Sequence, residues 1–363
     1  NLNCITSVFE LFPFGYPVFI GLRLESWIRE MERELPNEAE YVNGTSHFIQ
    51  MTENNQLQMR SEVITGLSHK SASLSSKFLY DATGSKIFAA ICELPEYYFA
   101  RAEKSIFEQD VREIAEVTGI NMSLIDLGAG NCAQATCLHP YLQPKQYVPI
   151  DISIEFFRDA VTKLQRRFPH IEMIGLGMDF TDRLDLPAIV RSEKRLFLWS
   201  GSSISKLTLS NSLKLLQRIH SLCVEGGRAG SGILISADLR KDKGIFEAAC
   251  NDTIGLTAAF NLNVLQRLNR DFGMDFQLSE WRHHTFFNGK ENRMEMHLQA
   301  RSQQIVRWSN GERLFKAGET INTENSYKFT IEGFVELLTK AGFGDIRIWT
   351  DMRKWITVCH ARA

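Results

Sequence analysis

The sequence lacks an excess of either charge. Its 363 residues hold 41 Lys and Arg against 43 Asp and Glu, a formal net charge of -2. A general nucleic-acid binder normally carries a clear basic excess, so we expect no nucleic-acid partner. With 44% hydrophobic and 23% charged residues, the composition also excludes disorder and fibrous repeats. The length exceeds what one core usually holds and predicts two domains, or one domain with a large insertion.

Paired cysteine motifs are missing as well. The seven cysteines include no C-x-x-C pair, and the nearest two, Cys132 and Cys137, are five positions apart. A zinc site or a disulfide framework needs tighter, paired spacing. We therefore predict no metal site and reduced thiols, which favours a cytoplasmic location.

No apolar run suits a membrane span. The segment from Val8 to Leu22 is apolar and aromatic, but Glu10 and two prolines interrupt it and no basic segment precedes it. It is too short and broken to cross a bilayer, and it is a poor signal peptide. We interpret residues 1–69 as a packed N-terminal arm with a helix at 24–34, and we expect a monomer. The alternative is that exposed apolar residues of this arm bind a protein partner or a membrane surface.

Short apolar strands alternate with helices in the middle of the chain. The expected strands are 123–127, 146–151, 172–176, 195–199 and 232–238. Helices are expected at 154–168 and 212–222, and two more, at 80–93 and 99–116, precede the strands. This rhythm predicts an α/β protein with a parallel sheet covered on both faces.

The alternation of strands and helices is interrupted between 241 and about 300 and then resumes. The break holds a helix at 256–269 and an antiparallel ribbon at 285–300, which together resemble an insertion. Further on, Thr330 is placed to cap a helix that ends at 341. Two further strands, 345–350 and 354–360, are expected after this helix.

Glycine and acidic residues follow four of the expected strands. In chain order these are Asp126, Gly128 and Gly130, then Asp151, then Asp179 and Phe180, then Gly201 and Ser202. Ligands of an open parallel sheet bind beyond the carboxyl ends of its strands. The glycines let a ligand approach the backbone. An acidic side chain at the end of the second strand can accept hydrogen bonds from the ribose hydroxyls. Asp179 can hydrogen-bond to an adenine amine, and Phe180 can pack against the adenine ring.

Two nucleotide cofactors fit this edge by spacing alone. Gly128-x-Gly130-x-x-Ala133 with Asp151 also satisfies the dinucleotide fingerprint. Three features favour S-adenosylmethionine. Asp126 directly precedes the glycine turn, and Asp179 closes the third strand. The final helix and the two strands after it suit the antiparallel end of a methyltransferase sheet. A nicotinamide-dependent enzyme, or ordinary turns without a nucleotide, stay open on this evidence.

Two longer strings are more specific. They are residues 78–88 (FLYDATGSKIF) and 94–103 (LPEYYFARAE). With the glycine turn, they resemble the histidine-specific Nα-methyltransferases of ergothioneine biosynthesis. The resemblance runs from about Ser75 to the C-terminus and includes 255–265 and 293–296. Residues 1 to about 70 lie mostly outside it.

The resemblance implies a fold and a cofactor. The fold is a Rossmann-like class I methyltransferase sheet, formed by 102–240 and 300–363, with an inserted α+β substrate-binding domain formed by 70–101 and 241–299. The cofactor is S-adenosylmethionine. Its implied contacts are Gly128, Asp151, Asp179 and Phe180, beside the strand-end residues Asp126, Gly130, Gly201 and Ser202.

The resemblance also implies substrate contacts. Tyr97 matches a tyrosine that contacts the amino-acid backbone of the substrate, and Tyr80 and Glu295 match residues that contact the imidazole. We expect a tyrosine hydroxyl or a water molecule to relay the proton of the amine. We expect Gly201 to leave room for the methyl group and the amine.

Three substrate positions depart from the family. Lys206 replaces an asparagine that holds the α-amino and carboxylate groups, and a lysine donates but cannot accept a hydrogen bond. Cys250 stands where the family has a tyrosine that grips the carboxylate. His297 stands where it has a small hydroxyl residue. These three residues complete the candidate substrate-binding set.

Three hypotheses follow. The first is an S-adenosylmethionine-dependent N-methyltransferase that acts on the amine of a small amino acid or related amine, with histidine as one candidate. The second is a non-catalytic S-adenosylmethionine-binding or interaction protein of the same fold. The third is a nicotinamide-dependent oxidoreductase.

Overall fold

A computed structural model describes residues 46–51, 56–152, 154–225, 227 and 230–363. The chain forms two compact units, Asn1–Val42 and Asn43–Ala363, and the described residues all belong to the second. The apolar segment from Val8 to Leu22 and the expected helix at 24–34 lie outside the described residues, and the interpretation of this arm stays a prediction.

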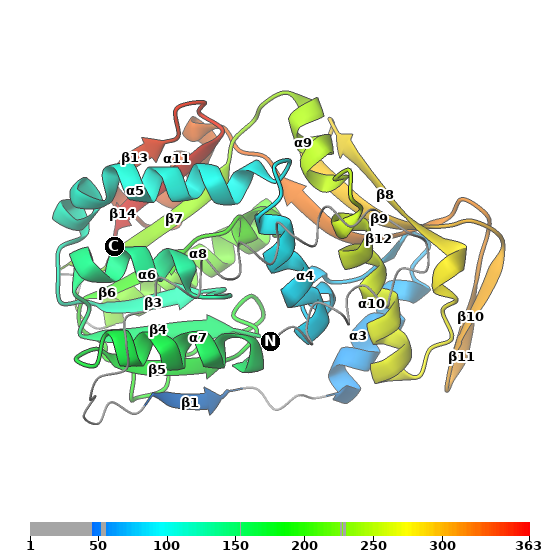
Figure 1. The fold of residues 1–363 in the computed structure, drawn as a ribbon, viewed down its shortest axis with the longest axis horizontal. Helices are drawn as coiled ribbons and strands as arrows, with labels where there is room; N and C mark the ends of the chain where they lie inside the picture. Colours follow the sequence, from blue (N-terminus) through cyan, green and yellow to red (C-terminus); the bar gives the residue numbers. More distant parts are fainter. Residues whose placement is uncertain (1–45, 52–55, 153, 226, 228–229) are drawn as a thin grey trace, which may run out of the picture. The chain divides into compact units, whose positions relative to one another are not determined.

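An eight-stranded sheet forms the larger part of the described unit (Figure 1). Its order is β1-β5-β4-β3-β6-β7-β14-β13. The strands are β1 (His47–Gln50), β3 (Ser123–Leu127), β4 (Gln146–Asp151), β5 (Glu172–Gly177), β6 (Arg195–Trp199), β7 (Gly232–Asp238), β13 (Gly344–Thr350) and β14 (Ile356–Arg362). The first six run parallel, whereas β14 is antiparallel to both β7 and β13. The expected class I methyltransferase sheet is confirmed, including its antiparallel end.

Two hydrophobic cores cover the two faces of this sheet. Alternate residues point to opposite faces of a strand, so Leu124 belongs to one core and Ile125 to the other. On the first face lie α5 (Tyr98–Thr118), α6 (Ala133–Leu142) and α7 (Ile154–Arg167). On the second lie α8 (Leu209–Glu225) and α11 (Ile331–Lys340). Thr330 caps α11 as expected, because its side chain accepts a hydrogen bond from the Gly333 amide.

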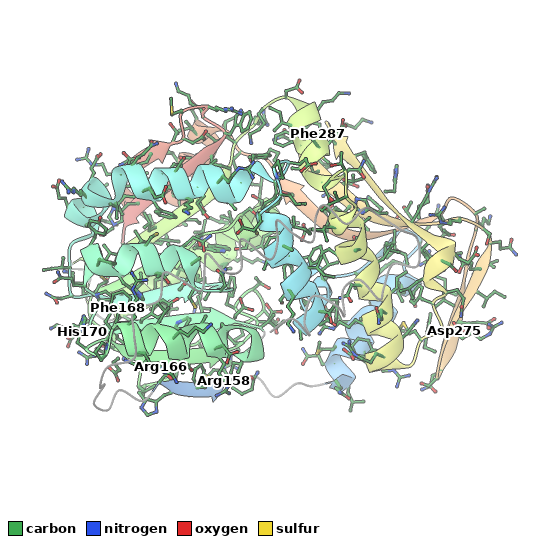
Figure 2. All side chains as sticks on the ribbon, in the orientation of Figure 1. Arg158, Arg166, Phe168, His170, Asp275 and Phe287 are labelled. Carbon is green, nitrogen blue, oxygen red and sulfur yellow. The ribbon has the colours of Figure 1, made fainter. Side chains whose placement is uncertain are left out.

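A second sheet has the order β2-β12-β9-β8. Its strands are β2 (Ala72–Ser73), β8 (Trp281–Asn288), β9 (Arg293–Ala300) and β12 (Thr320–Tyr327), and β10 (Gln304–Trp308) pairs separately with β11 (Gly311–Phe315). The helices of its core are α3 (Gln56–Ser68), α4 (Ala82–Cys92) and α10 (Leu256–Phe272). The helix α9 (Lys243–Cys250) packs against β8, where Phe246 and Phe287 stack with ring centroids 5.5 Å apart (Figure 2).

The sheet pairing corrects the expected limits of the two parts. We placed 300–363 with the larger sheet, but β12 pairs with β9 in the second. The strand was missed because its polar sequence, TINTENSY, does not read as a buried parallel strand. Likewise β1 and α3 lie within residues 1–69, which were interpreted as an N-terminal arm, and yet they belong to the two folded parts. Phe48 of β1 lies under the guanidinium of Arg158, 4.3 Å from the ring centroid (Figure 2).

In the part of the chain that the structure describes, no helix is both long enough and apolar enough to cross a membrane.

Candidate active site

The first part of the site is the turn after β3. Asp126 is 2% exposed, and one of its oxygens, Oδ2, accepts a hydrogen bond of 2.8 Å from the Tyr147 hydroxyl. The other oxygen, Oδ1, has no hydrogen-bond partner among the described residues. Burial raises the pKa of Asp126 to about 7, although the Tyr147 hydrogen bond opposes the rise. A buried acceptor without a partner is costly, so this oxygen is poised to receive a donor from a ligand.

The glycines of the turn adopt positive φ angles, 73° for Gly128 and 53° for Gly130. The amide of Gly130 donates to Asp151 Oδ2 at 3.1 Å, which joins the ends of β3 and β4. A Cβ atom on Gly128 would lie 3.7 Å from Phe180. The structure therefore brings the turn, Asp151 and Phe180 to one edge, as the sequence predicted.

The end of the third strand, β5, is held by Lys77, a residue that the sequence analysis did not identify. Asp179 accepts hydrogen bonds from the amide and hydroxyl of Thr181, at 3.1 and 2.6 Å. Its other oxygen lies 3.3 Å from Lys77 Nζ, which also pairs with Glu62 at 2.8 Å. Lys77 thus ties the region before α4 to the strand end. Nothing in the pattern around Lys77 marks such a long-range partner.

The fourth strand end depends on another missed residue, Glu103 of α5. Its side chain is fully buried and accepts a hydrogen bond from the Gly201 amide at 2.9 Å and another from Ser236 of β7. Burial raises the pKa of this carboxyl. Gly201 and Ser202 both have positive φ, 76° and 62°. Glu103 is the last residue of the string LPEYYFARAE, and its place in that string is the signal that could have found it.

A cavity of about 60 Å³ lies beyond the ends of β6 and β7 and reaches the second sheet. Four of the residues that line it come from the sequence-based set: Tyr97, Ser202, Lys206 and Cys250. The Tyr97 hydroxyl hydrogen-bonds to Ser202, and burial raises the pKa of Tyr97 well above its ordinary value. This tyrosine is therefore neutral at physiological pH and acts as a hydrogen-bonding group.

Lys206 points into the cavity. Its ammonium group donates to the Tyr80 hydroxyl and lies 3.4 Å from Glu324 of β12. It also lies over the aromatic rings of Tyr80 and Phe88, 4.2 and 5.5 Å from their centroids. Phe260 of α10 packs against both rings at 5.3 and 5.7 Å. The cation therefore sits in an aromatic box, which stabilises it by cation–π attraction.

Two expected residues, Glu295 and His297, do not reach the cavity. They flank Met296, which lines it, and neighbours on a strand point to the opposite face. On that face Glu295 accepts hydrogen bonds from Asn288 and Arg293, both at 2.8 Å, and lies 2.9 Å from His297 Nε2. The structure gives these two residues structural partners, and the acidic residues that line the cavity in the described part of the chain are Glu324 and Asp238.

A register shift explains why Glu324 takes this place. Asn322 pairs with His297, but Glu324 pairs with Met296, so one residue of β12 is inserted between the two pairs. The shift turns Glu324 and then Ser326 toward the cavity, where both are lining residues. No local feature of the sequence predicts such a shift.

The buried acid Asp126 gives a testable pH dependence. The native pKa of about 7 lies above the ordinary value of about 3.9. The unfolded chain therefore binds fewer protons between pH 4 and 7, and this group destabilises the native state progressively as the pH rises. Asp126→Asn should gain stability relative to the wild type between pH 4.5 and 7.5, measured by urea unfolding. The exposed control Asp182→Asn should show no such trend. A wild-type–variant difference that stays constant with pH contradicts the assignment.

Comparison with known proteins identifies the family. A family model described as histidine-specific methyltransferase, SAM-dependent, matches residues 59–363. The histidine N-alpha-methyltransferase of Mycolicibacterium smegmatis is 35% identical over 300 residues, which cover 81% of this chain and 91% of that protein. The enzyme of the same name from Mycobacterium tuberculosis is 34% identical over 301 residues, 81% of this chain and 92% of that protein.

Among solved structures, an S-adenosylmethionine-dependent methyltransferase from Clostridium acetobutylicum has 12% sequence identity and a TM-score of 0.40, over 77% of this chain and 95% of that one. This likeness is weak, and the fold rests on the sheet order described above. The family match favours the methyltransferase hypothesis over the oxidoreductase and the non-catalytic protein. The chain belongs to the S-adenosylmethionine-dependent histidine-specific methyltransferase family.

Proposed function

We propose that this enzyme methylates the amine of a small amino acid held in the cavity between the larger sheet and the second sheet. The position of Ser202 carries the proposal. Ser202 directly follows Gly201 at the end of β6, on the edge that holds the glycine turn, and it also lines the cavity. A substrate in the cavity would therefore lie against the cofactor edge, as alignment of two reactants requires.

The residues of the strand edge suit S-adenosylmethionine. The unpartnered Asp126 oxygen offers an acceptor to the ammonium group of the methionine part. We assign Asp151 to the ribose hydroxyls, and Asp179 and Phe180 to the adenine. Glycines with positive φ keep Cβ atoms away from the turn. When bound, the cofactor supplies an electrophilic methyl group.

The protein's own contribution is to place a neutral amine. An ammonium has no lone pair, so its proton must leave before methyl transfer. Tyr97 and Ser202 offer hydroxyls at the junction of cavity and edge, where they can orient the amine and pass its proton to water. Gly201 leaves open space beside them, because nothing lies within 4 Å of a Cβ built on it. Such alignment can lower a barrier by roughly 7–11 kcal/mol.

The far end of the cavity is set up for the substrate side chain. Phe88, Phe260 and Met296 give it apolar walls, and Glu324 gives it an acceptor. Lys206 already neutralises that acceptor. Histidine, which the names of the relatives specify, is one candidate substrate. The other candidate substrate is an amino acid whose side chain does not hydrogen-bond to Glu324.

A panel of amino acids incubated with the enzyme and S-adenosylmethionine tests the function directly. Mass spectrometry should detect a methylated amino acid that retains its carboxylate. Binding of S-adenosylhomocysteine by calorimetry, with no methylated product from any amino acid or amine, would overturn the proposal and restore the non-catalytic hypothesis.

Tyr97→Phe tests the hydroxyl at the junction. We expect kcat to fall by about 100-fold, the lower range for a lost proton-transfer group, while the affinity for S-adenosylhomocysteine stays within threefold. Tyr141→Phe, at a side chain that is 42% exposed, is the matched control and should leave kcat unchanged. Equal kcat values for Tyr97→Phe and wild type would remove Tyr97 from the reaction.

Lys206→Asn tests the ion pair at the far end. Removing the ammonium frees Glu324 to accept a hydrogen bond from an imidazole, so kcat/KM for histidine should rise by about tenfold, equivalent to ~1.4 kcal/mol. Lys290→Asn changes an exposed lysine on the β8–β9 turn and controls for the lost charge. A histidine kcat/KM that is unchanged or lower in Lys206→Asn would show that Lys206 does not limit recognition.

A further inference from the structure

A buried charge cluster forms the wall of the cavity at the end of β7. Asp238 is 3% exposed and accepts hydrogen bonds from the Tyr98 hydroxyl at 2.9 and 2.7 Å. Its two oxygens also pair with two lysines, Lys241 through Oδ1 and Lys328 through Oδ2, the latter at 2.7 Å. Asp238 and Lys328 both line the cavity.

The two lysines differ in how many acceptors they meet. Lys241 donates to three: Asp238, the Leu239 carbonyl at 2.7 Å and the Tyr98 hydroxyl at 3.1 Å. Lys328 donates to two, Asp238 and the Ser326 hydroxyl, both at 2.7 Å. An ammonium group has three N–H donors. Within the described residues, the third donor of Lys328 has no acceptor.

The ammonium groups of Lys241 and Lys328 have too few negative charges near them. Two buried ammonium groups share one carboxylate, whereas Lys206 has Glu324 to itself. Asp351 acts on Lys241 only as the weakest influence on its pKa, and its oxygens accept from backbone amides. Burial lowers the pKa of Lys241 to about 8. Buried charges need partners, so a ligand that brings a negative charge is favoured here.

There is room for such a group beside Lys328. The neighbouring lining residues Cys250 and Ser326 are small. Cys250 and Lys328 line the same cavity. Burial raises the pKa of Cys250 to about 12, and the charge of Lys328 opposes the rise. The third N–H of Lys328 is therefore available to a ligand that enters the cavity.

We propose that Lys328 anchors the carboxylate of the amino-acid substrate. The proposal rests on the proposed function, in which the cavity takes an amino acid. A charge-assisted hydrogen bond from a buried ammonium to a carboxylate is shorter and stronger than a neutral one. It would hold one end of the substrate at β7 while the side chain extends toward Glu324. The carboxylate of the cofactor's methionine part offers the same chemistry, and the experiment separates the two sources.

The experiment measures binding by calorimetry to the full chain loaded with S-adenosylhomocysteine. The ligands are histidine, or the amino acid that the panel identifies, and its decarboxylated amine. Lys328→Met should weaken the amino acid by about 30-fold and the amine by less than threefold. Lys328→Arg should recover most of the affinity. In Lys328→Met, Asp238 keeps Lys241 as its partner, so the buried carboxylate remains compensated.

Three results would overturn the role of Lys328. An equal loss for amino acid and amine would mean that Lys328 is structural. A loss of affinity for S-adenosylhomocysteine would mean that it holds the cofactor's carboxylate. An acid-specific loss in Lys206→Met but not in Lys328→Met would place the carboxylate on Lys206. Amino-acid binding without turnover would defeat the proposed function and leave the Lys328 result standing.

Discussion

The buried carboxylate of Asp238 joins the two sheets at the point where they meet. It ends β7 of the larger sheet, holds the first residue of α5 through the Tyr98 hydroxyl, and pairs with Lys328, which follows β12 of the second sheet. The backbone reinforces this junction, because the Phe329 amide donates to the Asp238 carbonyl at 2.9 Å. Buried charges are stable only when they are paired and hydrogen-bonded, so these partners hold the Asp238 carboxylate in place. The relative placement of Ser202 and Glu324 across the cavity therefore depends on this contact.

The cofactor edge could be predicted from the sequence because it is local. Each of its residues follows directly after a strand, and parallel strands bring their carboxyl ends to one edge whatever the rest of the chain does. The turn after β3, Asp151 and Phe180 accordingly meet as expected. What the local pattern did not contain was the support from other elements. Glu103 reaches Gly201 across 98 positions of sequence, and Lys77 reaches Asp179 from the region before α4.

The substrate side was harder to predict because it depends on strand pairing. A strand has a period of two, so a shift by one residue exchanges the faces. Glu295 and His297 were carried over by similarity, but their strand directs Met296 to the cavity. Lys206 was recognised as unusual from the sequence. Its partner could not be named, since β12 was expected to belong to the other sheet.

The register shift between Asn322 and Glu324 also limits how this protein can vary. Insertions and deletions are usually tolerated in loops, because a loop can absorb the change in length. Here the extra residue lies inside a paired strand, and without the shift Thr323 would pair with Met296 and Glu324 would face the other side of the sheet. The polarity of the binding site would then change without any substitution among its lining residues. The register of β12, as well as the identity of its residues, thus decides which side chain lines the cavity.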